Sequence, residues 1–154
     1  MLPDELLVDN PLFFMEVRRM LSRKHSVTMR AKGNSMYPFI LDGCDEVVLH
    51  RSTDIKAGDI VLAELPDSRY VLHRVYRVQG DRFVLMGDGN LQATEQCRKE
   101  NIVGKVVQII RGGRFVDCTS KAAYRKASIW RRLLPMRRYL LFVLRLYSKL
   151  KKQS

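Results

Sequence analysis

The first recurring pattern of apolar positions predicts a helix near the N-terminus. Apolar side chains recur there at helical spacing after an Asn-Pro pair: Phe13, Val17, Met20 and Leu21. Asn10 can cap the first turn, and Pro11 suits the first helical position, where no hydrogen-bonding N–H is needed. We therefore expect an amphipathic helix within residues 1–25 that packs one face on the rest of the protein.

From Ser26 onward the period changes to short alternating or apolar runs, which are typical of β-strands. Gly, Asp and Pro separate these runs, with turn sequences such as QGD and RGG between them. The candidate strands are SVTMRAK, DEVVLH, GDIVLAEL, RYVLHRVYRV, RFVLMG, IVGKVVQII and RFVD. This succession of strands without helices between them predicts a mainly β fold, with a compact and mostly antiparallel β domain over residues 26–118.

After Asp117 the pattern becomes helical again. Residues 119–134 and 135–152 predict two helices broken at Pro135, with Thr119 or Ser120 as the cap of the first. One apolar stripe runs along the second helix: Met136, Leu140, Val143, Tyr147 and Leu150. Its uninterrupted apolar run, YLLFVL, is far shorter than the roughly twenty residues that a bilayer span needs. We therefore expect a basic amphipathic tail over residues 119–154, not a transmembrane helix.

The charge of the protein is concentrated in this tail. The sequence holds 28 Lys and Arg against 16 Asp and Glu, a net charge of +12. Residues 1–110 hold 15 of each sign, so residues 111–154 hold 13 basic side chains against 1 acidic one and carry the whole excess. A neutral body with a cationic tail predicts an anionic partner. The amphipathic pattern favours an anionic membrane surface, and a basic helix packed on the domain in solvent is the alternative.

Cysteine usage and the N-terminus bear on the compartment. Cys44, Cys97 and Cys118 are widely spaced and form no C-x-x-C pair, which is typical of structural thiols in a reducing compartment. The N-terminus lacks the cationic start and long apolar run of a signal peptide. We expect a protein that is cytoplasmic or peripheral at the inner membrane surface, and nothing in the sequence implies a metal or organic cofactor.

Three polar side chains lie in an order that suggests chemistry: Ser35 in GNSMYP, His73 in VLHRV and Asp88 in GDGN. An imidazole can take the proton of a serine hydroxyl near neutral pH, and a carboxylate can orient that imidazole. Asp88 follows His73 after about one strand and one turn, so a hairpin could return the acid to the histidine. The neighbours of the serine are candidate oxyanion or substrate-binding residues: Gly33, Asn34 and Met36.

With their surroundings, these stretches resemble a known family. NSMYPFILDGCDEVV, IKAGDIVLAEL, RYVLHRVYRVQGDRFVLMGDGN and IVGKVVQI are similar to the conserved boxes of signal peptidase I. More broadly they resemble the serine-protease superfamily that contains the LexA-type self-cleaving repressors. The resemblance covers roughly residues 27–110 and implies Ser35 as nucleophile. Most bacterial signal peptidases have a lysine base, whereas His73 in YVLHRV resembles the histidine variant of archaeal, endoplasmic-reticulum and sporulation-type enzymes.

The resemblance leaves two candidates for the orienting acid. Asp88 matches the first aspartate of the GDNN box of those enzymes, many of which carry another aspartate several residues later. Here the later stretch reads LQATEQ, so Glu95 is the alternative.

The function that the resemblance implies is a serine endopeptidase that cleaves a leader or signal segment. Its substrate would add to the sheet as a β-strand, with small residues at the first and third positions before the cut. The alternative is a membrane-surface or nucleic-acid binding module on a LexA-like β fold without proteolytic turnover. Nucleic acid is the less favoured partner, because residues 1–25 are too few for a helix-turn-helix module.

On the membrane hypothesis, truncation after Asp117 is expected to keep proteolysis and to lose binding to anionic vesicles. Peptide cleavage and vesicle co-sedimentation by the truncated protein check the two halves of this prediction. Unchanged vesicle binding would give the tail another role.

Overall fold

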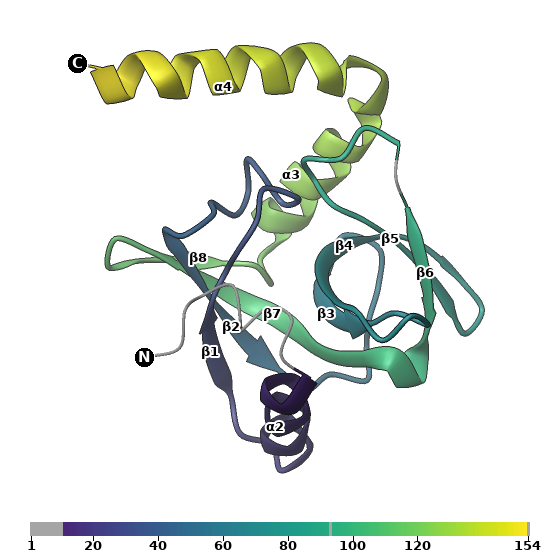
Figure 1. Ribbon diagram of the computed structural model, residues 1–154. Helices are drawn as coiled ribbons and strands as arrows, with labels where there is room; N and C mark the ends of the chain where they lie inside the picture. Colours follow the sequence, from purple (N-terminus) through teal and green to yellow (C-terminus); the bar gives the residue numbers. More distant parts are fainter. Residues whose placement is uncertain (1–10, 93, 154) are drawn as a thin grey trace.

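The computed structural model describes residues 11–92 and 94–153. In this part of the chain one helix precedes an antiparallel sheet of eight strands, and two helices follow it (Figure 1), which confirms the predicted mainly β fold. The helices are α2 (Pro11–Ser22), α3 (Lys121–Arg132) and α4 (Arg137–Gln153). The strands are β1 (Val27–Arg30), β2 (Asp45–His50), β3 (Ile60–Glu64), β4 (Tyr70–Gln79), β5 (Arg82–Met86), β6 (Glu95–Arg98), β7 (Ile102–Arg111) and β8 (Arg114–Asp117). The expected helix cap, Asn10, lies outside the described residues.

The sheet is organised around β7. The strand order is β1-β2-β7-β3-β4-β5-β6, and β8 also pairs with β7. The register shifts between Val48 and Leu49 where β2 pairs with β7, and again between Leu62 and Ala63 where β3 pairs with β7. Such irregularities bend a strand and increase its twist. The sheet therefore curls (Figure 1), and β3 to β6 surround a second core that is separate from the one under α2.

α2 packs one face on the half of the sheet that contains β1, β2 and β7. Its buried side chains are Phe14, Val17 and Leu21, spaced as one helical face requires. Fully burying a side chain of this size contributes about 1.5–3 kcal/mol. The helical spacing in the sequence predicts Phe13 and Met20 on this face as well. Phe13 is only partly buried and Met20 is exposed, because both lie at the margin of the buried face, whereas Phe14 lies at its centre.

β6 is the strand that the hydrophobic pattern did not predict. Its sequence is EQCR, and only Cys97 is buried. β6 is the last strand of the order, and β5 is its one neighbour there. Because only one face of this short strand is covered, a single apolar side chain is enough to fill it. A short polar edge strand of this kind carries almost no alternation signal.

The tail begins as the sequence predicts, with Ser120 as the cap of α3. The Ser120 hydroxyl accepts a hydrogen bond from the Ala123 amide at 3.1 Å. One turn further on, the Tyr124 hydroxyl donates to the buried carboxylate of Asp59. Burial, together with this carboxylate, raises the pKa of Tyr124 well above its ordinary value. The first tail helix is thus held on the β domain by a buried polar contact.

Two further contacts join the tail to the loop that follows β5. Trp130 Nε1 donates to the Asp88 carbonyl at 2.9 Å, and Arg137 Nη1 donates to the Asn90 carbonyl at 2.9 Å. Truncation after Asp117 would remove both donors. The expectation that such a truncation leaves proteolysis intact therefore needs correction, and the membrane hypothesis calls for point variants on α4.

α4 is the outermost helix in Figure 1. Within residues 11–92 and 94–153, no helix has the length and apolar character that crossing a bilayer would require.

Candidate active site

Ser35 lies in the turn-rich segment between β1 and β2. The turn is closed by the Tyr37 amide donating to the Asn34 carbonyl at 3.1 Å, and by the Phe39 amide donating to the Met36 carbonyl at 2.9 Å. Met36 and Ile40 are buried in the first core and anchor the turn on its C-terminal side. Ser35 itself is half-buried. The Met36 side chain is therefore a core residue, and only its backbone can face a substrate.

The loop after β5 contacts the Ser35 backbone closely. The Gly89 amide donates to the Ser35 carbonyl at 2.8 Å. A Cβ added at Gly87 would lie 2.2 Å from the same carbonyl oxygen. Glycine is required at this position because any side chain would occupy the place of the Ser35 main chain. GNSMYP and GDGN, which are far apart in sequence, are thus in direct contact.

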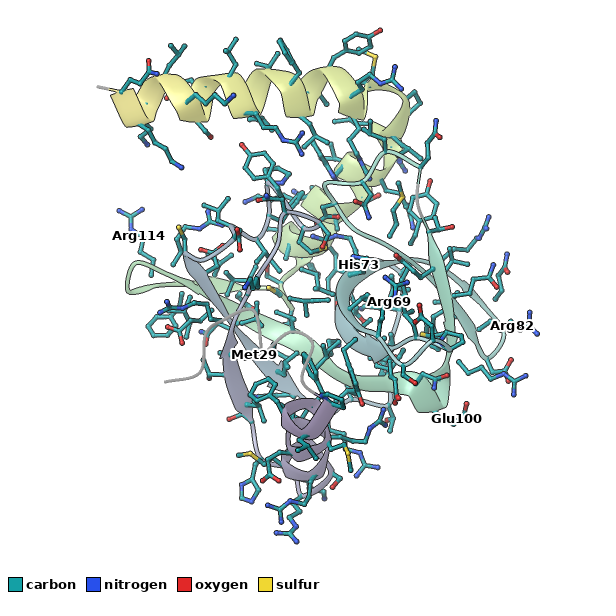
Figure 2. All side chains as sticks on the ribbon, viewed as in Figure 1. Met29, Arg69, His73, Arg82, Glu100 and Arg114 are labelled. Atoms are coloured by element: carbon teal, nitrogen blue, oxygen red, sulfur yellow. The ribbon has the colours of Figure 1, made fainter. Side chains whose placement is uncertain are left out.

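His73 lies on β4 (Figure 2) and contacts Glu95 on β6. The distance from His73 Nδ1 to Glu95 Oε2 is 2.9 Å, and the two side chains are 7% and 20% exposed. A carboxylate at Nδ1 favours the tautomer with its proton on Nδ1, and this leaves the Nε2 lone pair available to accept a proton. The described residues offer Nε2 no hydrogen-bond partner, so Nε2 is the candidate atom to accept a proton.

Asp88, the first-choice acid from the sequence, contacts Arg74 instead of His73. Arg74 Nε lies 2.8 Å from Asp88 Oδ1, and Arg74 Nη2 lies 2.7 Å from Asp88 Oδ2. Arg74 Nη1 also donates to the Gly58 carbonyl at 2.8 Å. Because successive side chains of a strand point to opposite faces, Arg74 and its partner lie on the face opposite to His73. The structure brings Glu95, the alternative acid, to the imidazole.

Extended by one residue beyond its last pair, the sheet register puts the Ser35 main chain and His73 on the same face. Arg74 pairs with Met86, so continuing the ladder sets His73 opposite Gly87. By alternation, a Cβ at Gly87 would point to the face of the imidazole, and that direction is filled by the Ser35 carbonyl. Within the described chain no hydrogen bond joins the Ser35 hydroxyl to His73. In substrate-free enzymes this contact is often long and closes only in the complex.

The residues beside Ser35 divide into a turn former and candidate donors. Gly33 has a φ of +87°, a conformation that favours glycine, and its amide already donates to Asp42 Oδ1 at 2.8 Å. Asn34 is exposed. The Ser35 amide donates to no described group, which leaves it as the candidate donor to an oxyanion.

A second ion pair fixes the far end of the Ser35 segment. Arg111 Nε lies 2.8 Å from Oδ1 of the buried Asp45, and Arg111 Nη2 donates to the Phe39 carbonyl at 3.0 Å. Asp45 Oδ2 also accepts from the Leu41 amide at 2.8 Å. The hydrogen bond that Arg111 donates to the Asp45 carboxylate raises the pKa of Arg111. These contacts hold the return from Ser35 to β2 against β7.

The cysteines lie outside this arrangement. All three are free, and Cys97 is buried in the second core. Burial raises the pKa of both the Cys97 and the Cys118 thiol to about 11. A thiol with this pKa is protonated and a poor nucleophile at neutral pH, as expected of a structural cysteine. Among the described residues no group of His, Cys, Asp and Glu side chains is arranged to hold a metal ion.

Residues 6–107 match the Peptidase S24-like family, which is more than half of the chain. The chain belongs to the Peptidase S24-like family. The matched region of this S24-like protein includes Ser35, His73, Asp88 and Glu95, and membership supports the predicted LexA-like serine-peptidase fold. The family match does not identify whether the general base is a histidine. No curated protein matches the chain.

Gly87→Ala tests the contact that brings Ser35 to the sheet. Its Cβ would meet backbone, so the Ser35 segment must shift, and we expect the free energy of unfolding to fall by about 1–3 kcal/mol. Gly80→Asn is the control, because Gly80 has open space around it and asparagine accepts a positive φ. Urea unfolding of both variants measures the difference. Equal stability of Gly87→Ala and the wild-type protein would contradict the close approach.

Proposed function

We propose that this protein is a serine endopeptidase of the signal-peptidase-like type, which cleaves a leader or signal segment from a peptide or preprotein. The observation that carries the proposal is the buried His73–Glu95 contact on the face of the sheet where the Ser35 main chain lies. Membership of the Peptidase S24-like family supports the reaction class. The choice of His73 as base and of Glu95 as orienting acid is part of the proposal.

In this mechanism the Ser35 Oγ attacks the carbonyl carbon of the scissile bond while His73 Nε2 takes the hydroxyl proton. Glu95 holds Nδ1–H and stabilises the imidazolium that forms. The Ser35 amide donates to the oxyanion of the tetrahedral intermediate. When the intermediate collapses, the C–N bond breaks and the imidazolium protonates the leaving amine. Water then hydrolyses the acyl-enzyme, with His73 as base again.

Burial makes this arrangement more effective than the same groups would be in water. The effective dielectric around a buried pair is lower than in solvent, so the hydrogen bond that orients the imidazole is stronger than it would be in water. His73 is almost fully covered, whereas Glu95 keeps a small exposed fraction. The packing of β4, β5 and β6 fixes both side chains before substrate arrives, which lowers the reorganisation needed in the transition state.

The sheet supplies a path for an extended substrate. β1 ends the strand order and pairs with β2 within the described sheet, so its other edge is available for a further strand. The chain passes from β1 directly toward Ser35. A peptide added to this edge would gain main-chain hydrogen bonds, and its alternate side chains would point toward the domain. This placement supports cleavage of a segment that is extended, not helical.

Ser35→Ala and His73→Ala test the chemistry directly. With a peptide that carries an Ala-x-Ala cleavage site, we expect each variant to lose about a thousandfold or more of kcat, because each removes a member of the proton-transfer pair. His50→Ala is the matched control, since His50 is exposed on β2. Mass spectrometry of the cleavage products measures the rates. Equal cleavage by wild type and both variants would end the proposed mechanism.

Glu95→Gln and Asp88→Asn separate the two acids. We expect Glu95→Gln to lower kcat at least tenfold and to have no further effect in a His73→Ala background, because Glu95 acts through His73. Asp88→Asn leaves the Arg74 charge buried without its partner, so we expect the free energy of unfolding to fall by about 3 kcal/mol, also in the His73→Ala background. A double-mutant cycle with kcat and urea unfolding distinguishes the roles. Coupling of Asp88, but not Glu95, to His73 would reverse the assignment.

A further inference from the structure

The outward face of α4 is apolar and has no covering element in the described structure. Its side chains recur at helical spacing, and each is about half exposed or more: Tyr139, Phe142, Val143, Leu146, Tyr147 and Leu150. The opposite side of the helix faces the body, where Arg137 and Leu141 are buried. Folded monomers rarely expose a contiguous apolar patch of this kind unless it meets a partner.

Basic side chains border this apolar face. Arg138, Arg145 and Lys149 follow one another at spacings of seven and four residues, so they lie along one flank of the helix. The sequence of α4 contains no Asp or Glu. An apolar face with a cationic flank is the pattern of a helix that lies in the interface of an anionic bilayer. A nucleic acid would attract the basic side chains but would leave the apolar face in water. A second copy of α4 would cover the apolar face but would bring like charges together.

We propose that α4 lies in the headgroup region of an anionic membrane and holds the Ser35 segment at the membrane surface. The inward side of the same helix contacts that segment. The Tyr37 hydroxyl and the Ser148 hydroxyl are 3.2 Å apart, and the Arg145 guanidinium lies 5.8 Å from the centre of the Tyr37 ring. Tyr37 is two residues beyond Ser35. A docked α4 therefore separates the bilayer from the Ser35 segment by about one helix diameter, 10–12 Å.

The docking of α4 also limits the substrates that can reach Ser35, an inference that rests on the proposed function. A peptidase whose nucleophile lies beside a membrane-surface helix acts on segments that are themselves held at that surface. The docking of α4 does not depend on proteolysis, so the two are separable by experiment. Ser35→Ala should bind vesicles as the wild-type protein does while its cleavage is lost.

The test is co-sedimentation of the full chain with vesicles of phosphatidylcholine alone or mixed equally with phosphatidylglycerol. We expect preference for the anionic vesicles, and at least a tenfold lower partition coefficient for Phe142→Ser combined with Leu146→Ser. Phe115→Ser is the matched control, because Phe115 and Phe142 are both 67% exposed. Arg138→Gln and Lys149→Gln should each weaken binding to anionic vesicles about fivefold at low salt. Emission of Trp130, the one tryptophan in the sequence, checks that each variant keeps its fold.

A tryptophan introduced at the outward face reports where the helix lies. Phe142→Trp should be quenched by brominated phosphatidylcholine in anionic vesicles, whereas Phe115→Trp should not. Wild-type vesicle binding by the Phe142→Ser, Leu146→Ser variant would overturn the proposal. Binding to duplex DNA without binding to vesicles would also overturn it, as would self-association without lipid that Phe142→Ser abolishes. Vesicle binding by wild type together with normal cleavage by Ser35→Ala would refute the proposed function and leave the docking of α4 intact.

Discussion

The close approach of two backbone segments is the constraint on which the candidate site depends. The Ser35 carbonyl occupies the space that a side chain at Gly87 would fill and accepts the Gly89 amide at 2.8 Å. This contact fixes the Ser35 segment at the end of β5, beside the position that the sheet register sets opposite His73. The proposed nucleophile, Ser35, is thus positioned by the absence of a side chain at Gly87. This backbone contact does not orient the His73 ring, which is held instead by the Glu95 carboxylate.

The C-terminal helices and the buried carboxylate of Asp88 stabilise that approach from other directions. Trp130 and Arg137 donate to the carbonyls of Asp88 and Asn90, so the loop that contacts Ser35 is held on its far side by the tail. Asp88 binds Arg74 across the sheet. One segment, α3 and the start of α4, therefore supports the candidate site, while the outward face of α4 is exposed. In the proposed docking, the same helix would couple the position of the body at a membrane surface to the position of Ser35.

The sequence predicted the strands better than the contacts of the acid. Alternating apolar runs identified the strands that have a buried face, and the surroundings of Ser35 and His73 carry the prediction that these two residues act together. Asp88 was favoured over Glu95 because a Gly-Asp-Gly turn is a recognisable motif, whereas Glu95 lies on β6, a polar edge strand with one buried side chain. The contact between His73 and Glu95 also depends on pairing across β5, a long-range register that no local pattern contains. The hydrogen bonds of Trp130 and Arg137 to the loop after β5 join distant parts of the chain, so no local pattern predicts them either.

The proposed function depends on Ser35 acting as the nucleophile on an extended peptide, with His73 as its general base. The most direct measurement is a crystal structure with a peptide aldehyde whose sequence ends at an Ala-x-Ala cleavage site. We predict a covalent bond from Ser35 Oγ to the aldehyde carbon. The resulting oxygen should accept a hydrogen bond from the Ser35 amide, and His73 Nε2 should lie within hydrogen-bonding distance of Oγ. The peptide should run along β1. The proposed mechanism would be contradicted by a peptide that binds elsewhere. It would also be contradicted by a peptide that binds at β1 while Ser35 stays unmodified and His73 points away from it.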